Sequence, residues 1–199
     1  MKFAPKLLLQ GGAEHEVAEL TPSTLIKWPR RGRRMPDGGV LKTYRAIQRE
    51  LDWLHQLEVP MPKTEICDAS FIEMPDGSFV VPYCMITEKK AGTHFRGADL
   101  ARPEVRRDFS TIMRAARSLI AMSGHTLDLF GYREIHKALR PELPLTQNLL
   151  TCEEGLVLVD PSLRVLHTGS SLGRDLDMEI RTFVQNTLGA VLLACHDAV

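Results

Sequence analysis

The sequence has no long apolar run and no excess of either charge. Nowhere do about 18 apolar residues follow one another, so we expect no membrane span. The N-terminal segment holds only the short apolar run Leu7–Leu9, which is too short for the core of a signal peptide, and we therefore expect a cytoplasmic protein. Lys and Arg total 25, as do Asp and Glu, so no global charge directs the chain to nucleic acid or to membranes. Any electrostatic function must be local.

Paired cysteines are also missing. The four cysteines are widely spread and include no CxxC pair, which argues against a zinc site or a disulfide framework. We expect buried free thiols at Cys67, Cys84, Cys152 and Cys195. With 199 residues, of which 44% are hydrophobic, the chain can form one domain or two small lobes around a real core.

The first ninety residues show patterns typical of strands with one helix. Short apolar runs at 7–9, 17–20 and 25–28 are separated by Gly11-Gly12 and Pro22-Ser23. Residues 71–74 and 78–81 flank a turn at 75–77, and 83–86 continue as an apolar strand. From residue 43 the period changes, and the apolar residues predict an amphipathic helix: Tyr44, Ile47, Leu51, Leu54 and Leu57.

The second half is expected to be mostly helical. Two stripes at helical spacing run from Phe109 to Ile120 and from Leu176 to Val191. Between them, residues 148–160 form an expected hairpin with a turn at 153–155. Together the patterns predict an α+β protein with a strand-rich lobe over 1–90, a linker at Ala91-Gly92, a helical lobe over 91–199 and a cleft between the lobes.

Four features in this order could bind a nucleotide. Gly11 and Gly12 would let backbone N–H groups approach a phosphate, although an ordinary turn also uses Gly-Gly. Lys27 could neutralise phosphate oxygens or simply face solvent. Glu50 lies on the apolar stripe of its helix, where a carboxylate is uncommon unless it is paired, for example with Lys27.

The fourth feature is a pair of oxygen donors. Asn148 and Asp160 are brought together at one end of the expected hairpin, and their oxygens suit Mg²⁺ carrying nucleotide phosphates. The alternative for this pair is a capping Asn and a turn Asp before Pro161.

The order of these features resembles the protein-kinase-like superfamily, and most closely its small atypical members. Residues 8–14 with Leu25-Ile26-Lys27 look like the start of RIO kinases and of the KEOPS-complex kinase, and lipopolysaccharide-kinase-like proteins belong to the same group. Residues 86–89 resemble the hinge that meets adenine, and 158–160 resemble the metal-binding aspartate segment, although Pro161-Ser162 replaces the usual Phe-Gly. Residues 173–177 are similar to a segment of the RIO C-lobe, whereas His15 stands where a third loop glycine is expected.

The resemblance implies a two-lobed, ATP-binding phosphotransferase that acts on a protein or small-molecule hydroxyl. It implies that the phosphates are bound by Gly11, Gly12, Lys27 and Glu50. It also implies that Glu88 and its neighbours contact adenine and that Asn148 and Asp160 bind Mg²⁺. Asp160 is then a residue on which catalysis depends.

One departure concerns the catalytic base. In that family an aspartate lies five positions before the metal-binding Asn, and here the position is Leu143, which cannot accept a proton. Glu142 is the nearest carboxylate, and His125 with Asp128 form another candidate pair, although His125 is expected at a helix end and Asp128 in a turn. The alternative is a pseudokinase that regulates or scaffolds a partner.

The stretch 27–34 is basic. It carries five cations in eight residues and could bind RNA or an acidic protein. No aromatic stacking platform accompanies it, and the alternative is a solvated loop.

Overall fold

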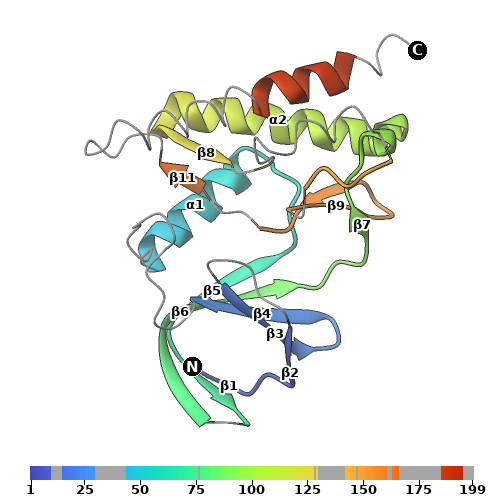
Figure 1. Ribbon diagram of the computed structural model, residues 1–199. Helices are drawn as coiled ribbons and strands as arrows, with labels where there is room; N and C mark the ends of the chain where they lie inside the picture. Colours follow the sequence, from blue (N-terminus) through green and yellow to red (C-terminus); the bar gives the residue numbers. More distant parts are fainter. Residues whose placement is uncertain are drawn as a thin grey trace. The chain divides into compact units, whose positions relative to one another are not determined.

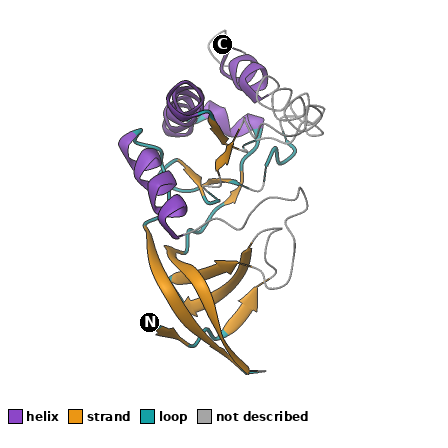
Figure 2. Cartoon of the chain, turned by 90° about the vertical axis from the view of Figure 1, so that its left-hand side faces the viewer, coloured by secondary structure: helices purple, strands orange, loops and turns teal. Residues whose placement is uncertain are grey.

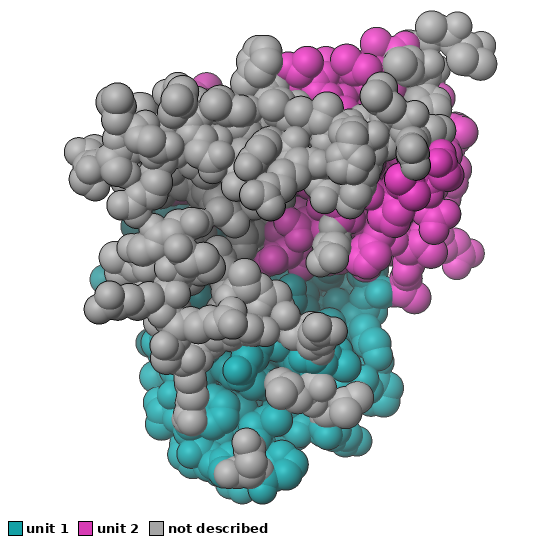
Figure 3. All heavy atoms as spheres, viewed as in Figure 1, with its two compact units in different colours: residues 1–51, 62–90 teal, residues 52–61, 91–199 magenta. Residues whose placement is uncertain are grey.

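The structure is a computed structural model that describes residues 1–9, 15–29, 44–75, 77–127, 129, 142–146, 148–160, 163–165 and 185–194. It is an α+β protein with a mixed six-stranded sheet, two short sheets and helices (Figure 1). The chain divides into two compact units, coloured separately in Figure 3. Unit 1 comprises Met1–Leu51 and Pro62–Lys90, and unit 2 comprises Asp52–Met61 and Ala91–Val199. Residues 52–61 therefore group with unit 2, although they lie within the first ninety.

Unit 1 is built on the six-stranded sheet. Its strands lie in the order β1-β5-β6-β4-β3-β2, and all neighbours are antiparallel except β1 and β5. The bounds are β1 Lys2–Phe3, β2 Leu7–Leu9, β3 His15–Thr21, β4 Thr24–Pro29, β5 Thr64–Met74 and β6 Gly77–Glu88. The strands expected at 7–9, 17–20 and 25–28 and the hairpin at 71–81 are confirmed. The hairpin is longer than expected because polar residues such as Asp68 interrupt the apolar pattern of its first strand.

One face of this sheet carries its own hydrophobic core. The core residues are Ala18, Ile26, Trp28, Cys67, Ile72, Val81 and Cys84. Trp28 is fully buried, and its Nε1 donates to Glu16 Oε2 at 2.9 Å, so the indole nitrogen keeps a partner inside the core. Cys67 and Cys84 are direct cross-strand partners, and burial raises the pKa of the Cys84 thiol to about 11. The expectation of buried free thiols is confirmed for these two residues and for Cys152.

Helix α1, Tyr44–Gln56, belongs to both units. Its residues up to Leu51 count with unit 1, and those from Asp52 count with unit 2. Ile47, Leu51 and Leu54 are all buried, which confirms the predicted apolar stripe. Leu54 joins the core of unit 2.

Unit 2 is organised around helix α2, Pro103–Ser123, and a C-terminal helix over residues 185–194 (Figure 2). A 3₁₀ helix, Gly97–Ala101, precedes α2. Proline at the first position suits a helix start, and Gly124 with φ 65° ends the helix in the left-handed conformation. Among the described residues, no helix is both long and apolar enough to cross a membrane.

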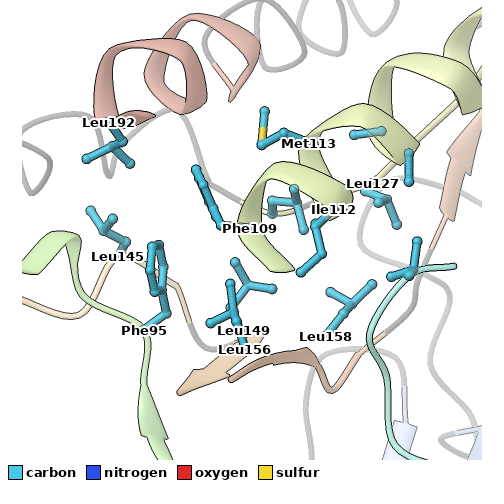
Figure 4. Close-up of a cluster of buried hydrophobic side chains, with 14 of the residues drawn as sticks. Phe95, Phe109, Ile112, Met113, Leu127, Leu145, Leu149, Leu156, Leu158 and Leu192 are labelled. Atoms are coloured by element: carbon cyan, nitrogen blue, oxygen red, sulfur yellow. The ribbon is translucent and has the colours of Figure 1, made fainter. Parts of the chain in front are cut away.

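The core of unit 2 collects side chains from both helices and from short strands. Figure 4 shows Phe109, Ile112 and Met113 of α2 packed with Phe95 and with Leu149, Leu156 and Leu158. The stripe predicted from Phe109 onward is therefore confirmed. Of the stripe predicted over 176–191, the structure describes 185–191, and these residues are helical.

Several strands of unit 2 were not anticipated. Strand β7, Thr93–His94, extends the expected hairpin of β9, Leu149–Thr151, and β10, Leu156–Leu158, into a three-stranded sheet. Strands β8, His125–Leu127, and β11, Leu163–Val165, form a second small sheet. His125, expected at a helix end, is the first residue of β8. These strands have two or three residues, which is too short for any periodicity to show.

The β9–β10 hairpin is fastened at its turn to the start of α2. The buried Asp108 accepts the Leu156 N–H through Oδ2 at 3.0 Å, while Arg107 donates to its Oδ1 at 2.9 Å. Arg102 donates from Nη1 to the Cys152 carbonyl at 3.0 Å and from Nη2 to the Glu153 carbonyl at 2.7 Å. Since charge-assisted hydrogen bonds are the stronger kind, the turn is held firmly.

Gly155 makes this contact possible, which leads to a first prediction. Its φ is +148°, and a Cβ at this position would meet Asp108 Oδ2. Gly155→Ala should therefore lower the free energy of unfolding by more than the roughly 1–3 kcal/mol of backbone strain alone. Gly77→Ala is the matched control, because Gly77 has φ +143° but open space around its Cβ position. Urea unfolding of both variants measures the difference, and equal losses would show that the Asp108 contact is unimportant.

Candidate functional site

Lys27 stands in the middle of one face of the unit 1 sheet. Its direct partners are Val17 on β3 and Met85 on β6, and Met85 in turn pairs with Ile66 on β5. Because side chains alternate along a strand, this row lies on the face opposite to the Trp28 core. Lys27 is half-buried, and its direct cross-strand neighbours Val17 and Met85 are apolar.

A second row of side chains lies next to this one on the same face. It contains His15, two residues before Val17 on β3, and Tyr83, two residues before Met85 on β6. His15 Nε2 and Tyr83 Oη lie 3.0 Å apart, and the two rings meet edge to face at a centroid distance of 6.0 Å. Sequence reasoning missed this pair, because His15 was read only as a missing glycine and Tyr83 only as part of an apolar strand. The alternation that places both with Lys27 becomes informative only once the register is known.

Glu50 is buried on α1. It is 6% exposed and lies among the buried Ile47, Leu51 and Leu54, which confirms that the carboxylate is on the buried stripe. A buried carboxylate is retained only with a cation or with hydrogen-bond donors. The ion pair with Lys27 stays a prediction.

Asn148 and Asp160 lie at the open end of the β9–β10 hairpin. Leu149 and Leu158 are the last paired residues, and the Val159 N–H then donates to the Asn148 carbonyl at 2.8 Å. The backbone therefore sets Asn148 beside Val159, with Asp160 next along the chain. The Asn148 N–H donates to Thr146 Oγ1 at 3.0 Å, which orders the approach to the strand.

This donor set fits magnesium. Mg²⁺ keeps several waters and is held by one or two protein oxygen ligands together with substrate phosphates. The amide oxygen of Asn148 and the carboxylate of Asp160 are ligands of the type that Mg²⁺ accepts. In the described part of the chain, no group of three or more His, Cys, Asp or Glu side chains gathers to form a closed metal cage.

The segment that carries Leu143 is anchored on its C-terminal side. Leu145 is fully buried, and its N–H donates to the Phe95 carbonyl at 2.8 Å, while Pro144 forms an isolated bridge with Arg96. Leu143 is half-buried and Glu142 is exposed. Glu142 thus lies three residues before the anchored Leu145. That Glu142 replaces the missing catalytic base stays a prediction.

Glu88, expected near adenine, ends strand β6. Its N–H donates to the Lys63 carbonyl and the next N–H, that of Lys89, donates to the Ser23 carbonyl. Its carboxylate pairs with Lys90 at 3.0 Å. These backbone donors are used within unit 1, so an adenine contact from Glu88 would have to come from its carbonyl or its side chain.

The Glu88 side chain also borders a hollow on unit 1. The hollow has a volume of about 490 Å³ and is lined by Ser23, Thr24, Lys63, Thr64, Glu65, Ile86 and Glu88. It lies at the end of the sheet where β4 and β5 begin and β6 ends.

Other predicted residues lie outside the described residues. These are Gly11, Gly12, Asp128, Pro161-Ser162, Cys195, residues 173–177 and residues 30–34 of the basic stretch. Within the described part of that stretch, Trp28 is a core residue and offers no stacking surface.

Comparison with protein-family models and with curated proteins gave no match. The function is therefore argued from the arrangement of residues.

The state of Glu88 leads to a second prediction. The hydrogen bond from Lys90 and, after it, the one from the Lys63 backbone lower the pKa of the Glu88 carboxyl. Lys90→Ala should therefore raise this pKa toward its ordinary value, as measured by a carboxyl-carbon NMR titration. Lys89→Ala is the control, because Lys89 pairs with Glu19 and not with Glu88. An unchanged Glu88 titration in Lys90→Ala would contradict the pairing.

Proposed function

We propose that the protein binds Mg-ATP in the manner of small atypical kinases and transfers phosphate to a hydroxyl of a protein or small molecule. Magnesium, when bound with the nucleotide, would offset the negative charge of the phosphate oxygens. Lys27 holds phosphate oxygens, Glu50 holds Lys27, and Asn148 with Asp160 hold the metal.

The local order of unit 1 supports this proposal. In protein kinases the phosphate-binding lysine lies on the third strand of the N-lobe, behind a glycine-rich turn, and pairs with a glutamate of the following helix. Here β1, β2, β3 and β4 precede α1, and Lys27 lies on β4, the third strand counted from β2, with the buried Glu50 on α1. Apart from the short β1, this order of described elements agrees with the kinase order.

The observation that carries the proposal is the hydrogen bond from the Val159 N–H to the Asn148 carbonyl at the open end of the hairpin, because Asp160 is the next residue along the chain. Kinases use an Asn of the catalytic loop and an Asp after the next strand pair for their metal ions. The hairpin carries the same two residue types, one before its first strand and one after its second, and its turn is fastened by Asp108 and Arg102. Such rigidity is what a metal site needs.

Asp160→Asn tests the proposal directly. A ligand that binds only the folded state stabilises it by RT ln(1 + [L]/Kd), which is about 2.7 kcal/mol at 100 times Kd. We expect Mg-ATP to raise the melting temperature of the wild type and Asp160→Asn to lose most of that rise. Glu154→Gln is the control, because Glu154 is an exposed carboxylate at the opposite end of the same hairpin. Equal rises in the two variants, or none in the wild type, would refute the proposal.

A second function is favoured by Leu143, which leaves the usual base position without a carboxylate. In this reading the protein is a pseudokinase that binds nucleotide and acts through a partner. If transfer is slow only because the base is missing, Leu143→Asp should raise the rate of phosphate release or transfer by about 10²-fold.

Leu143→Asn is the control for this fourth prediction, since it has nearly the same size as Asp but no basic carboxylate. A rate increase in Leu143→Asp alone supports the enzyme. Unchanged rates in both variants, with Mg-ATP still bound, support the pseudokinase.

A further inference from the structure

The His15–Tyr83 pair shares its sheet face with Lys27. Val17 is the direct partner of Lys27 on β3, and Met85 is its direct partner on β6. His15 and Tyr83 are the next residues of the same face on those two strands, so both are diagonal neighbours of Lys27. Diagonal neighbours have Cα atoms roughly 7–8 Å apart, which is within the reach of long side chains.

Tyr83 fixes the imidazole in place. Its side chain is 2% exposed, and a buried phenol needs a hydrogen-bond partner. His15 Nε2 supplies that partner at 3.0 Å, and His15 as a whole residue is half-buried. One nitrogen of the ring is therefore anchored in unit 1, although the residue is not sealed off from solvent. A ligand that contacts it loses little conformational entropy on binding.

The two acidic residues next to the His15–Tyr83 pair in the strand register have hydrogen-bond partners elsewhere. Glu16, the neighbour of His15, points to the opposite face, where its carboxylate accepts from Trp28. Asp68, the cross-strand partner of Tyr83, is exposed, and its Oδ1 accepts from the Ala69 N–H at 2.9 Å. When the Tyr83 hydroxyl donates to His15 Nε2, the imidazole carries its proton on Nδ1 and can donate it to a phosphate oxygen, while Lys27 supplies a positive charge on the same face.

We propose that His15, positioned by Tyr83, forms with Lys27 a phosphate-binding face on unit 1. This inference deepens the proposed function, because the phosphates are those of the nucleotide. It assigns His15 as a ligand-contacting residue and Tyr83 as a positioning residue. Neither role follows from the resemblance to kinases, in which His15 is only a departure from the glycine pattern.

The test measures how much the phosphates contribute to binding. For each variant, calorimetry gives the Kd for adenosine and the Kd for Mg-ATP, and the first divided by the second is the adenosine-to-ATP ratio. Titration with inorganic tripolyphosphate measures phosphate binding without the nucleoside. His15→Ala should lower the adenosine-to-ATP ratio about tenfold, which corresponds to the loss of one hydrogen bond to a charged group. Tyr83→Phe should lower it about threefold, and His15→Gln should retain part of it because an amide can still donate.

Thr21→Ala is the control variant, because it also removes a side-chain hydrogen bond made by strand β3. Thr21 Oγ1 lies 2.6 Å from Thr24 Oγ1 at the other end of that strand, and its removal should leave the ratio unchanged. Circular dichroism establishes that each variant is folded.

The outcomes separate the inference from the proposed function. If Lys27→Ala lowers the ratio and His15→Ala does not, the inference is wrong and nucleotide binding stands. If the wild type binds tripolyphosphate through His15 but neither nucleotide nor adenosine, the phosphate face stands and the proposed function fails. If the wild type binds none of the three probes, both are overturned.

Discussion

The buried carboxylate of Asp108 ties helix α2 to the β9–β10 hairpin, and the organisation of unit 2 depends on this contact. It satisfies the Leu156 N–H, it is balanced by Arg107, and it requires a glycine at residue 155. A buried charge without these partners would cost several kcal/mol. Because they are present, the hairpin takes one orientation on α2, and its open end presents Asn148 and Asp160 from a rigid support.

In unit 1 the core side chains and a group of polar side chains lie on opposite faces of the same sheet. The alternation of side chains sends Trp28, Ile26 and Cys84 to one face, where they form a closed core. The other face receives Lys27, His15 and Tyr83. Strand β4 therefore contributes to the core through Ile26 and Trp28 and, in the proposed function, to phosphate binding through Lys27, which lies between them.

The sequence predicted the elements with strong periodicity and missed those without it. Helix α2 and the stripe of α1 followed from spacing, and the hairpin that joins Asn148 to Asp160 followed from its glycine turn. Strands β7, β8 and β11 could not be foreseen, because two or three residues acquire strand geometry only from a partner distant in sequence. The same holds for His15 and Tyr83, which are separated by 68 positions and meet only through the strand order. Local patterns could not show Asp108 as a hairpin anchor either, since its acceptor role depends on the turn at Gly155.

The division of helix α1 between the two units has a consequence for how the protein can be separated into parts. The chain passes from one unit to the other three times, between residues 51 and 52, between 61 and 62, and between 90 and 91. A fragment that ended at residue 90 would keep Leu54 and Val59 but lack the Phe95 and Phe109 cluster that buries them. Exposed apolar surface of that kind promotes association. The two units are therefore interleaved along the chain, and no single cut of the chain separates one complete unit from the other.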